Sequence, residues 1–177
     1  MEKMKKAGEL MIPLDSYPHV PYWFSLRQAM AVMEKSQVYH DTHGRQSPSR
    51  FVLVFDEAYK LLGITRRRDI LRGLELHFLT PTRSDEPKKP SDQETDSRPP
   101  EISSDKLIEG IREQAERPVS DVMLPIQATV DHDDPIMKVI SKMVGHNVSM
   151  LPVLQENRVV GVIRSVEVFH EIANLIL

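Results

Sequence analysis

Two arginines, each followed three residues later by an acid, are the residues of this chain whose types and spacing could do chemistry. Arg66 and Asp69, and again Arg164 and Glu167, stand three and six positions after a glycine. A guanidinium group can hold a phosphate through two parallel charge-assisted hydrogen bonds. The run Arg66–Arg68 also precedes an expected helix N-terminus, which favours anions. This pattern indicates a polyphosphate site; alternatively, at least two of these three arginines simply solvate a surface turn.

Each arginine–acid pair belongs to a longer unit that the chain contains twice. Residues 60–71 and 158–169 both read as a basic residue, two aliphatic residues, Gly, a short apolar strand, Arg and an acid. Upstream, each copy has an apolar stripe at the spacing of one helix face. The stripes are Leu26, Ala29, Met30 and Met33, and Ile136, Val139, Ile140 and Met143. In the second copy, Asp134-Pro135 reads as an N-cap followed by proline at the first helical position. We therefore expect strand, helix, strand, strand, helix in each unit.

The order of these fragments resembles that of the cystathionine-β-synthase (CBS) domain pair, also called a Bateman module. The second copy carries the resemblance in Val119–Met123, Thr129-Val130, Leu151–Val153 and Val160–Ile163 with Glu167, and the first in Leu10–Pro13, His19-Val20, Leu53-Val54 and Leu62–Ile64 with Asp69. No fragment is specific alone, but their repeated order and spacing are. The resemblance implies a stand-alone, bacterial-type protein with an α+β fold, in which two tandem βαββα CBS units pack about a pseudo-twofold axis.

The expected boundaries follow from composition. Residues 8–79 form the first CBS unit, with an insert at about 38–50, and residues 119–177 form the second. Residues 80–103 are expected to be a flexible linker, because the stretch 80–101 has no apolar residue with which to offset the entropy of ordering. Residues 104–118 are expected to form a linker helix that packs against the second unit. The insert contains His40-Asp41-Thr42-His43, which we interpret as a solvated turn and not as a metal site.

The resemblance also implies roles for individual residues. In the family, the acid accepts hydrogen bonds from both ribose hydroxyls of a bound adenosine, as a carboxylate can; alternatively, Asp69 and Glu167 only complement a helix dipole. The position three after each Gly is normally Thr or Ser, whereas this chain has arginine there and Thr65 or Ser165 beside it. The family also places backbone groups and apolar side chains of the strand entries, here His19–Tyr22 and Thr129–His132, around the adenine ring. The candidate ligand-binding residues are Asp69, Arg66, Arg68, Thr65, Val20, Pro21, Glu167, Arg164, Ser165 and Val130.

Composition excludes several other classes of protein. The chain has no cysteine, and no apolar stretch approaches the roughly 20 residues that span a bilayer. Its N-terminus lacks the apolar core of a signal peptide, so a cytoplasmic location is expected. A net charge of −3 disfavours nucleic-acid binding, which requires a basic surface. No motif places a nucleophile beside a base, so no enzyme activity and no required cofactor or metal are expected.

With the composition in agreement, the resemblance implies a regulatory module that binds AMP, ADP, ATP or a related adenosyl compound and acts through a separate effector protein, still unidentified. Because the apolar stripes, together with the apolar C-terminal helix, give more apolar surface than two small units can cover, a homodimer is predicted. The alternative is a dimerising scaffold that has lost ligand binding, which the arginines at positions 66 and 164 favour.

Overall fold

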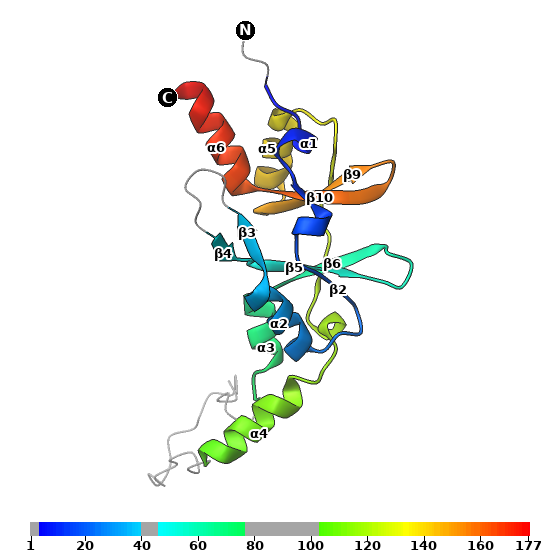
Figure 1. Ribbon diagram of the computed structural model, residues 1–177, viewed down its shortest axis with the longest axis vertical. Coiled ribbons are helices and arrows are strands. Elements are labelled where there is room, and N and C mark those ends of the chain that lie inside the picture. The colour runs from blue at the N-terminus through cyan, green and yellow to red at the C-terminus, as the bar shows by residue number, and fades with distance from the viewer. Residues whose placement is uncertain (1–3, 40–45, 77–102) are drawn as a thin grey trace, which may run out of the picture.

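The computed structural model describes residues 4–39, 46–76 and 103–177, and its centre consists of two four-stranded sheets with helices on their outer faces (Figure 1). The predicted α+β class is therefore confirmed. The proposed turn His40–His43 and the stretch 80–101 of the predicted linker lie outside the described residues. No helix in the described part is long and apolar enough to cross a membrane.

The first unit has the expected order of elements. It consists of β2 (His19–Pro21), α2 (Leu26–Lys35), β5 (Phe51–Phe55), β6 (Leu61–Arg66) and α3 (Arg67–Gly73). Helix α2 begins where it does because the Ser25 hydroxyl accepts a hydrogen bond from the Gln28 N–H, while the Gln28 side chain accepts one from the Ser25 N–H. Strand β2 is parallel to β5, which pairs antiparallel with β6.

The second unit repeats this arrangement with β8 (Val130–Asp131), α5 (Ile136–Gly145), β9 (Met150–Gln155), β10 (Arg158–Arg164) and α6 (Ser165–Ile176). Strand β8 is parallel to β9, and β9 pairs antiparallel with β10. The start of α5 differs from the prediction, because Pro135 is the N-cap and Asp134 lies one residue before it. The Asp134 carboxylate accepts a hydrogen bond from the Asp131 N–H instead.

The two units exchange their opening segments. Strand β1 (Ile12–Pro13) pairs with β10 of the second unit, and β7 (Leu124–Pro125) pairs with β6 of the first. A Cβ atom at Gly63 or Gly161 would overlap the backbone carbonyl of the exchanged strand, which explains the glycine in each copy. Helix α1 (Ala7–Leu10) likewise packs into the second core, and the 3₁₀ turn Val119–Asp121 into the first. This reciprocal exchange relates the units by a pseudo-twofold axis and joins them into one body.

Each unit has its own hydrophobic core between its sheet and its helices, and a third apolar cluster joins the sheets. That cluster contains Tyr17, Leu53, Phe55, Met150 and Val162. The predicted helix stripes are mostly buried within their own units, as Leu26, Met33, Ile136 and Met143 are. Met30 of the first stripe is nevertheless exposed, as are Phe169 and Ile176 of the C-terminal helix, so the homodimer expected from these surfaces stays a prediction.

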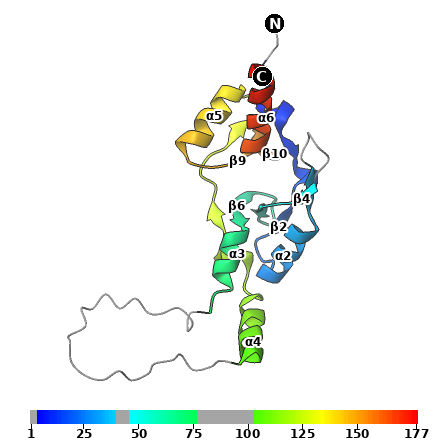
Figure 2. The same cartoon turned by 90° about the vertical axis from the view of Figure 1, so that its left-hand side faces the viewer.

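Two connecting segments differ from the sequence-based expectation. The insert begins and ends in two short strands, β3 (Gln37–Tyr39) and β4 (Gln46–Pro48), which pair antiparallel. Helix α4 (Ser104–Gln114) lies beyond α3, far from α5 and α6 (Figure 2). A Cβ atom at Gly110 would lie 3.2 Å from the Leu76 side chain. The predicted linker helix thus exists, but it contacts the first unit, not the second.

Candidate functional site

The first arginine–acid pair lies where β6 passes into α3. The fully buried carboxylate of Asp69 accepts hydrogen bonds from the backbone N–H of Arg66 at 3.0 Å, from its Nε at 2.8 Å and from its Nη2 at 3.0 Å. Arg72 Nη2 lies 3.4 Å from the same carboxylate. Burial alone would raise the pKa of Asp69, but the hydrogen bonds and charge of Arg66 outweigh it and hold the pKa below its usual value. Asp69 is therefore a charged, buried group whose partner is its own arginine.

The second pair repeats this geometry where β10 passes into α6. Glu167 accepts hydrogen bonds from the backbone N–H of Arg164 at 3.1 Å and from its Nε at 3.0 Å, and the Nη2 group also contacts the carboxylate. The Arg164 side chain is 12% exposed, against 41% for Arg66. Both acids therefore close the N-terminus of the following helix, and the second arginine is much less accessible.

A cleft of about 280 Å³ lies beside the first pair; we call it the Arg66 cleft. Its walls come from Ile64 and Arg66 at the end of β6, from Phe51, and from residues 124–128 and 146–152 of the second unit. Because the opening segments are exchanged, residues of both units meet here. The lining is about equally polar and apolar: Arg66 contributes a cationic group, and Gln127, His146, Asn147 and Ser149 contribute polar ones. Such an arrangement suits a planar apolar group joined to an anion.

Several predicted site residues lie outside this cleft. Successive residues of a strand point to opposite faces, so Thr65 lies on the core side while Ile64 and Arg66 line the cleft. Thr65 is fully buried, and its hydroxyl has no hydrogen-bond partner within the described residues. The side chains of Val20 and Val130 belong to the two cores.

The remaining predicted residues lie nearer the surface. Arg68 is exposed on α3, where it lines a shallow groove with Leu71, Arg72 and Ile111. Ser165 is exposed at the start of α6, and Pro21 is half-buried at the end of β2. Of the ten predicted site residues, only Arg66 contributes to the lining of the Arg66 cleft.

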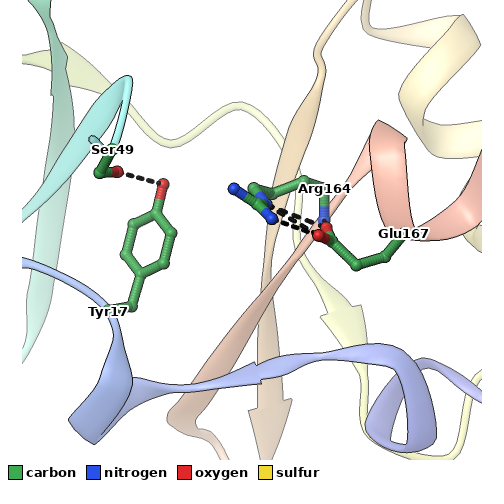
Figure 3. Close-up of polar contacts among 4 residues, drawn as sticks. All are labelled: Tyr17, Ser49, Arg164 and Glu167. Atoms are coloured by element: carbon green, nitrogen blue, oxygen red, sulfur yellow. Dashed lines mark hydrogen bonds and ion pairs between the residues drawn. The ribbon is translucent and has the colours of Figure 1, made fainter. Parts of the chain in front are cut away.

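Tyr17 is a buried residue near the Arg164–Glu167 pair that the sequence analysis did not identify. Its hydroxyl lies 3.2 Å from Ser49 Oγ, and Figure 3 shows the ring beside the Arg164–Glu167 pair. Ser49 donates its hydroxyl proton to the Phe51 carbonyl at 2.7 Å, so Tyr17 is the donor to Ser49. Burial raises the pKa of the Tyr17 hydroxyl, which favours the neutral donor form. We call Tyr17, Ser49, Arg164 and Glu167 the Tyr17 site.

The comparisons with known proteins agree with this architecture. A family model described as "CBS domain" matches residues 119–174, and no curated protein matches the chain. The fold is similar to that of CBSX2 in a crystal structure with AMP, at 15% identity and a TM-score of 0.61, over 96% of this chain and 97% of the other. It is similar to the CBS domain pair of protein MJ0100 in complex with 5′-methylthioadenosine and S-adenosyl-L-methionine, at 17% identity, TM-score 0.61, and 98% and 99% coverage.

A third similar structure is the CBS domain of a CBS domain-containing membrane protein from Sphaerobacter thermophilus, at 16% identity and a TM-score of 0.65, covering 94% of this chain and 87% of the other. Residues 119–174 therefore match the CBS domain family, and the fold of the whole chain is similar to that of a CBS domain pair. The predicted resemblance is confirmed. The family model does not extend to the first unit, but the first unit has the same order of strands and helices as the second.

Proposed function

We propose that this chain is a regulatory module that binds an adenine nucleotide in the Arg66 cleft and acts through a separate partner protein. The observation that carries the proposal is the cleft itself, since it lies between the two units, has both apolar and polar walls and contains the exposed edge of Arg66. Structures of two CBS pairs with this fold are described in complex with AMP or with adenosyl compounds. A cytoplasmic location fits such a ligand.

Arg66 is the residue that we assign to the phosphate. A guanidinium has five N–H donors in a planar fork. The Nε donor and one Nη2 donor are directed at Asp69, so the outer edge can hold phosphate oxygens without breaking that pair. Asp69 then acts as a positioning residue that fixes the plane of the guanidinium. A direct bond from Asp69 to ribose, which the family resemblance implies, would require Arg66 to leave the buried carboxylate.

The size of the cleft favours a mononucleotide. Small-molecule sites in proteins range from about 300 to 1,000 Å³, and this cleft, at about 280 Å³, lies just below that range. Phe51, Ile64 and Ile126 provide the apolar contact that an adenine ring requires. Gln127, Asn147 and Ser149, which line the same cleft, offer hydrogen-bonding groups for the edge of the base.

Calorimetric titration with adenosine, AMP, ADP and ATP tests the proposal. We expect affinity to rise with phosphate charge and this preference to shrink as salt rises, because screening weakens exposed charge interactions. A ligand at a hundredfold excess over its Kd should raise the free energy of unfolding by about 2.7 kcal/mol. Absence of binding by all four compounds at millimolar concentration would overturn the proposal.

The alternative function is a dimerising scaffold without a ligand. It is favoured by the fact that both acids are already occupied by their own arginines. Apolar side chains on the outer helices provide a surface for dimerisation, and the most exposed are Leu71 on α3, Met137 and Val144 on α5, and Phe169 and Ile176 on α6. We expect a homodimer under either function. Light scattering at micromolar concentration measures the mass, and Phe169→Glu, on the α6 surface, should shift it toward the monomer.

A further inference from the structure

The Tyr17 site and the Arg66 cleft occupy corresponding positions in the two repeated units, as the pairing of their strands shows. Val20 pairs with Val54, and Val130 pairs with Val153, at matching places in the two sheets. Counting back three residues from each places Tyr17 and Gln127 at the same position of the repeated unit. Gln127 is exposed and lines the Arg66 cleft, whereas Tyr17 is only 2% exposed. One position of the duplicated fold therefore carries an exposed amide on one side and a buried aromatic ring on the other.

The opening segments explain why the ring is buried. Ile12 and Leu124 occupy equivalent places, opposite Val162 and Ile64. Eight positions separate Ile12 from Val20, but six separate Leu124 from Val130. The two additional residues lie in the segment that forms the 3₁₀ turn Leu14–Ser16, whose Leu14 carbonyl accepts the Tyr17 N–H. This turn directs the Tyr17 ring into the apolar cluster between the sheets.

Hydrogen bonds hold the ring in that place. The Tyr17 hydroxyl binds buried Ser49, and Ser49 in turn binds the Phe51 carbonyl. The Tyr17 carbonyl also lies 2.9 Å from His19 Nδ1. A ligand entering beside Arg164 would have to displace a satisfied buried hydroxyl and reach an arginine that is 12% exposed. Both requirements oppose an anion there.

We infer that Tyr17 closes the second ligand site, so that each chain binds a single nucleotide and does so in the Arg66 cleft. The inference rests on the proposed function and adds its stoichiometry and location. Tyr17 takes the place of a ligand: its ring supplies the apolar contact of a base, and its hydroxyl supplies the hydrogen bond to Ser49. Of the two equivalent positions, only the one beside Arg66 then remains open to a nucleotide.

Calorimetric titration with ATP of the wild type and of exchange variants tests the inference. We expect one site per chain in the wild type. Gln127→Tyr changes an exposed residue and should weaken binding at least about tenfold. Tyr17→Gln should raise the stoichiometry to two, while Tyr17→Phe, which keeps the ring, should leave it at one. Two sites in the wild type, or a Gln127→Tyr variant with unchanged affinity, would overturn the inference, whereas no binding by any variant would overturn the proposed function.

A second measurement does not depend on a ligand and remains informative if Tyr17→Gln does not fold. Nitration by tetranitromethane, mapped by mass spectrometry, reports which tyrosine rings are accessible in the full chain. Tyr59 is 65% exposed and should react quickly, whereas Tyr17 should react only as the protein unfolds. Equal rates at the two tyrosines would show that the ring does not close the site.

Discussion

The Arg66 cleft and the Tyr17 site contain the same arginine–acid pair in two different surroundings. Both arginines end a strand, and both acids accept their arginine's backbone and side-chain N–H groups from the first turn of a helix. The neighbours differ: Gln127 leaves one arginine beside an open cleft, and Tyr17 brings a buried ring to the other. The arginine–acid pair therefore belongs to the framework of the repeated unit. The two sides differ in the residue three positions before the buried valine of β2 or β8, which is Tyr17 in one unit and Gln127 in the other.

The largest expected effect on stability comes from Gly63 and Gly161, and it tests whether the two units are built in the same way. A methyl group at Gly63 or Gly161 would meet the backbone carbonyl of Leu124 or Ile12, which cannot move without breaking the exchanged strand pair. We expect Gly63→Ala and Gly161→Ala each to lower the free energy of unfolding by about 3 kcal/mol. Urea denaturation measures this. Gly145→Ala is the matched control, because a Cβ atom there meets nothing within 4 Å and should not destabilise. A large effect at only one of the two glycines would break the equivalence.

A second prediction separates the role of Arg66 in the fold from its role in the cleft. Arg66→Ala leaves the buried Asp69 with Arg72 as its only cationic partner within the described residues. Removing one member of a fully buried pair costs about 3–5 kcal/mol, and because Arg66 is partly exposed we expect about 2 kcal/mol. The variant should also lose the preference for ATP over adenosine. Arg68→Ala, which changes an exposed arginine on α3, should alter stability by less than about 0.5 kcal/mol. A similar loss in both variants would mean that the Asp69 pair is unimportant.

The pH dependence of stability sharpens the description of Asp69. Because the pKa of Asp69 is lower in the folded state than in the unfolded chain, its contribution is present above the unfolded value, near about 4, and is lost as pH falls through the folded value. The wild type should therefore lose stability more steeply below about pH 4 than Asp69→Asn does. Thermal melts between pH 3 and 7 measure the two slopes. Identical slopes would show that Asp69 is not held ionised by Arg66.

The sequence repeat was sufficient to predict the class of fold and the order of elements, because the helix stripes and the glycine strands recur at matching places. It could not predict the exchange of opening segments, since a repeat shows which segments are alike and not which ones pair. The position of α4 was wrong for a related reason: Leu107, Ile108 and Ile111 indicate an amphipathic helix but not its neighbour. The partner of Asp69 was available from spacing, because an arginine three residues before an acid at a helix start can form a capping pair. Tyr17 could not be distinguished from Gln127 without the burial that the 3₁₀ turn imposes.

The smallest expected effect on stability concerns one core position that is Thr65 in the first unit and Ile163 in the second. Thr65 and Ile163 stand at equivalent positions, two residues after their glycines, and both are fully buried. The Thr65 hydroxyl has no partner among the described residues, and a buried hydroxyl without a hydrogen bond is destabilising. Thr65→Val keeps the shape of the side chain and replaces the hydroxyl with a methyl group, so we expect the free energy of unfolding to rise by about 1 kcal/mol. Ile163→Thr is the reciprocal control and should lower it by a larger amount, because it introduces a hydroxyl and removes apolar volume. Urea denaturation of both variants decides the point, and a loss of stability in Thr65→Val would mean that the hydroxyl has a partner that the fold requires.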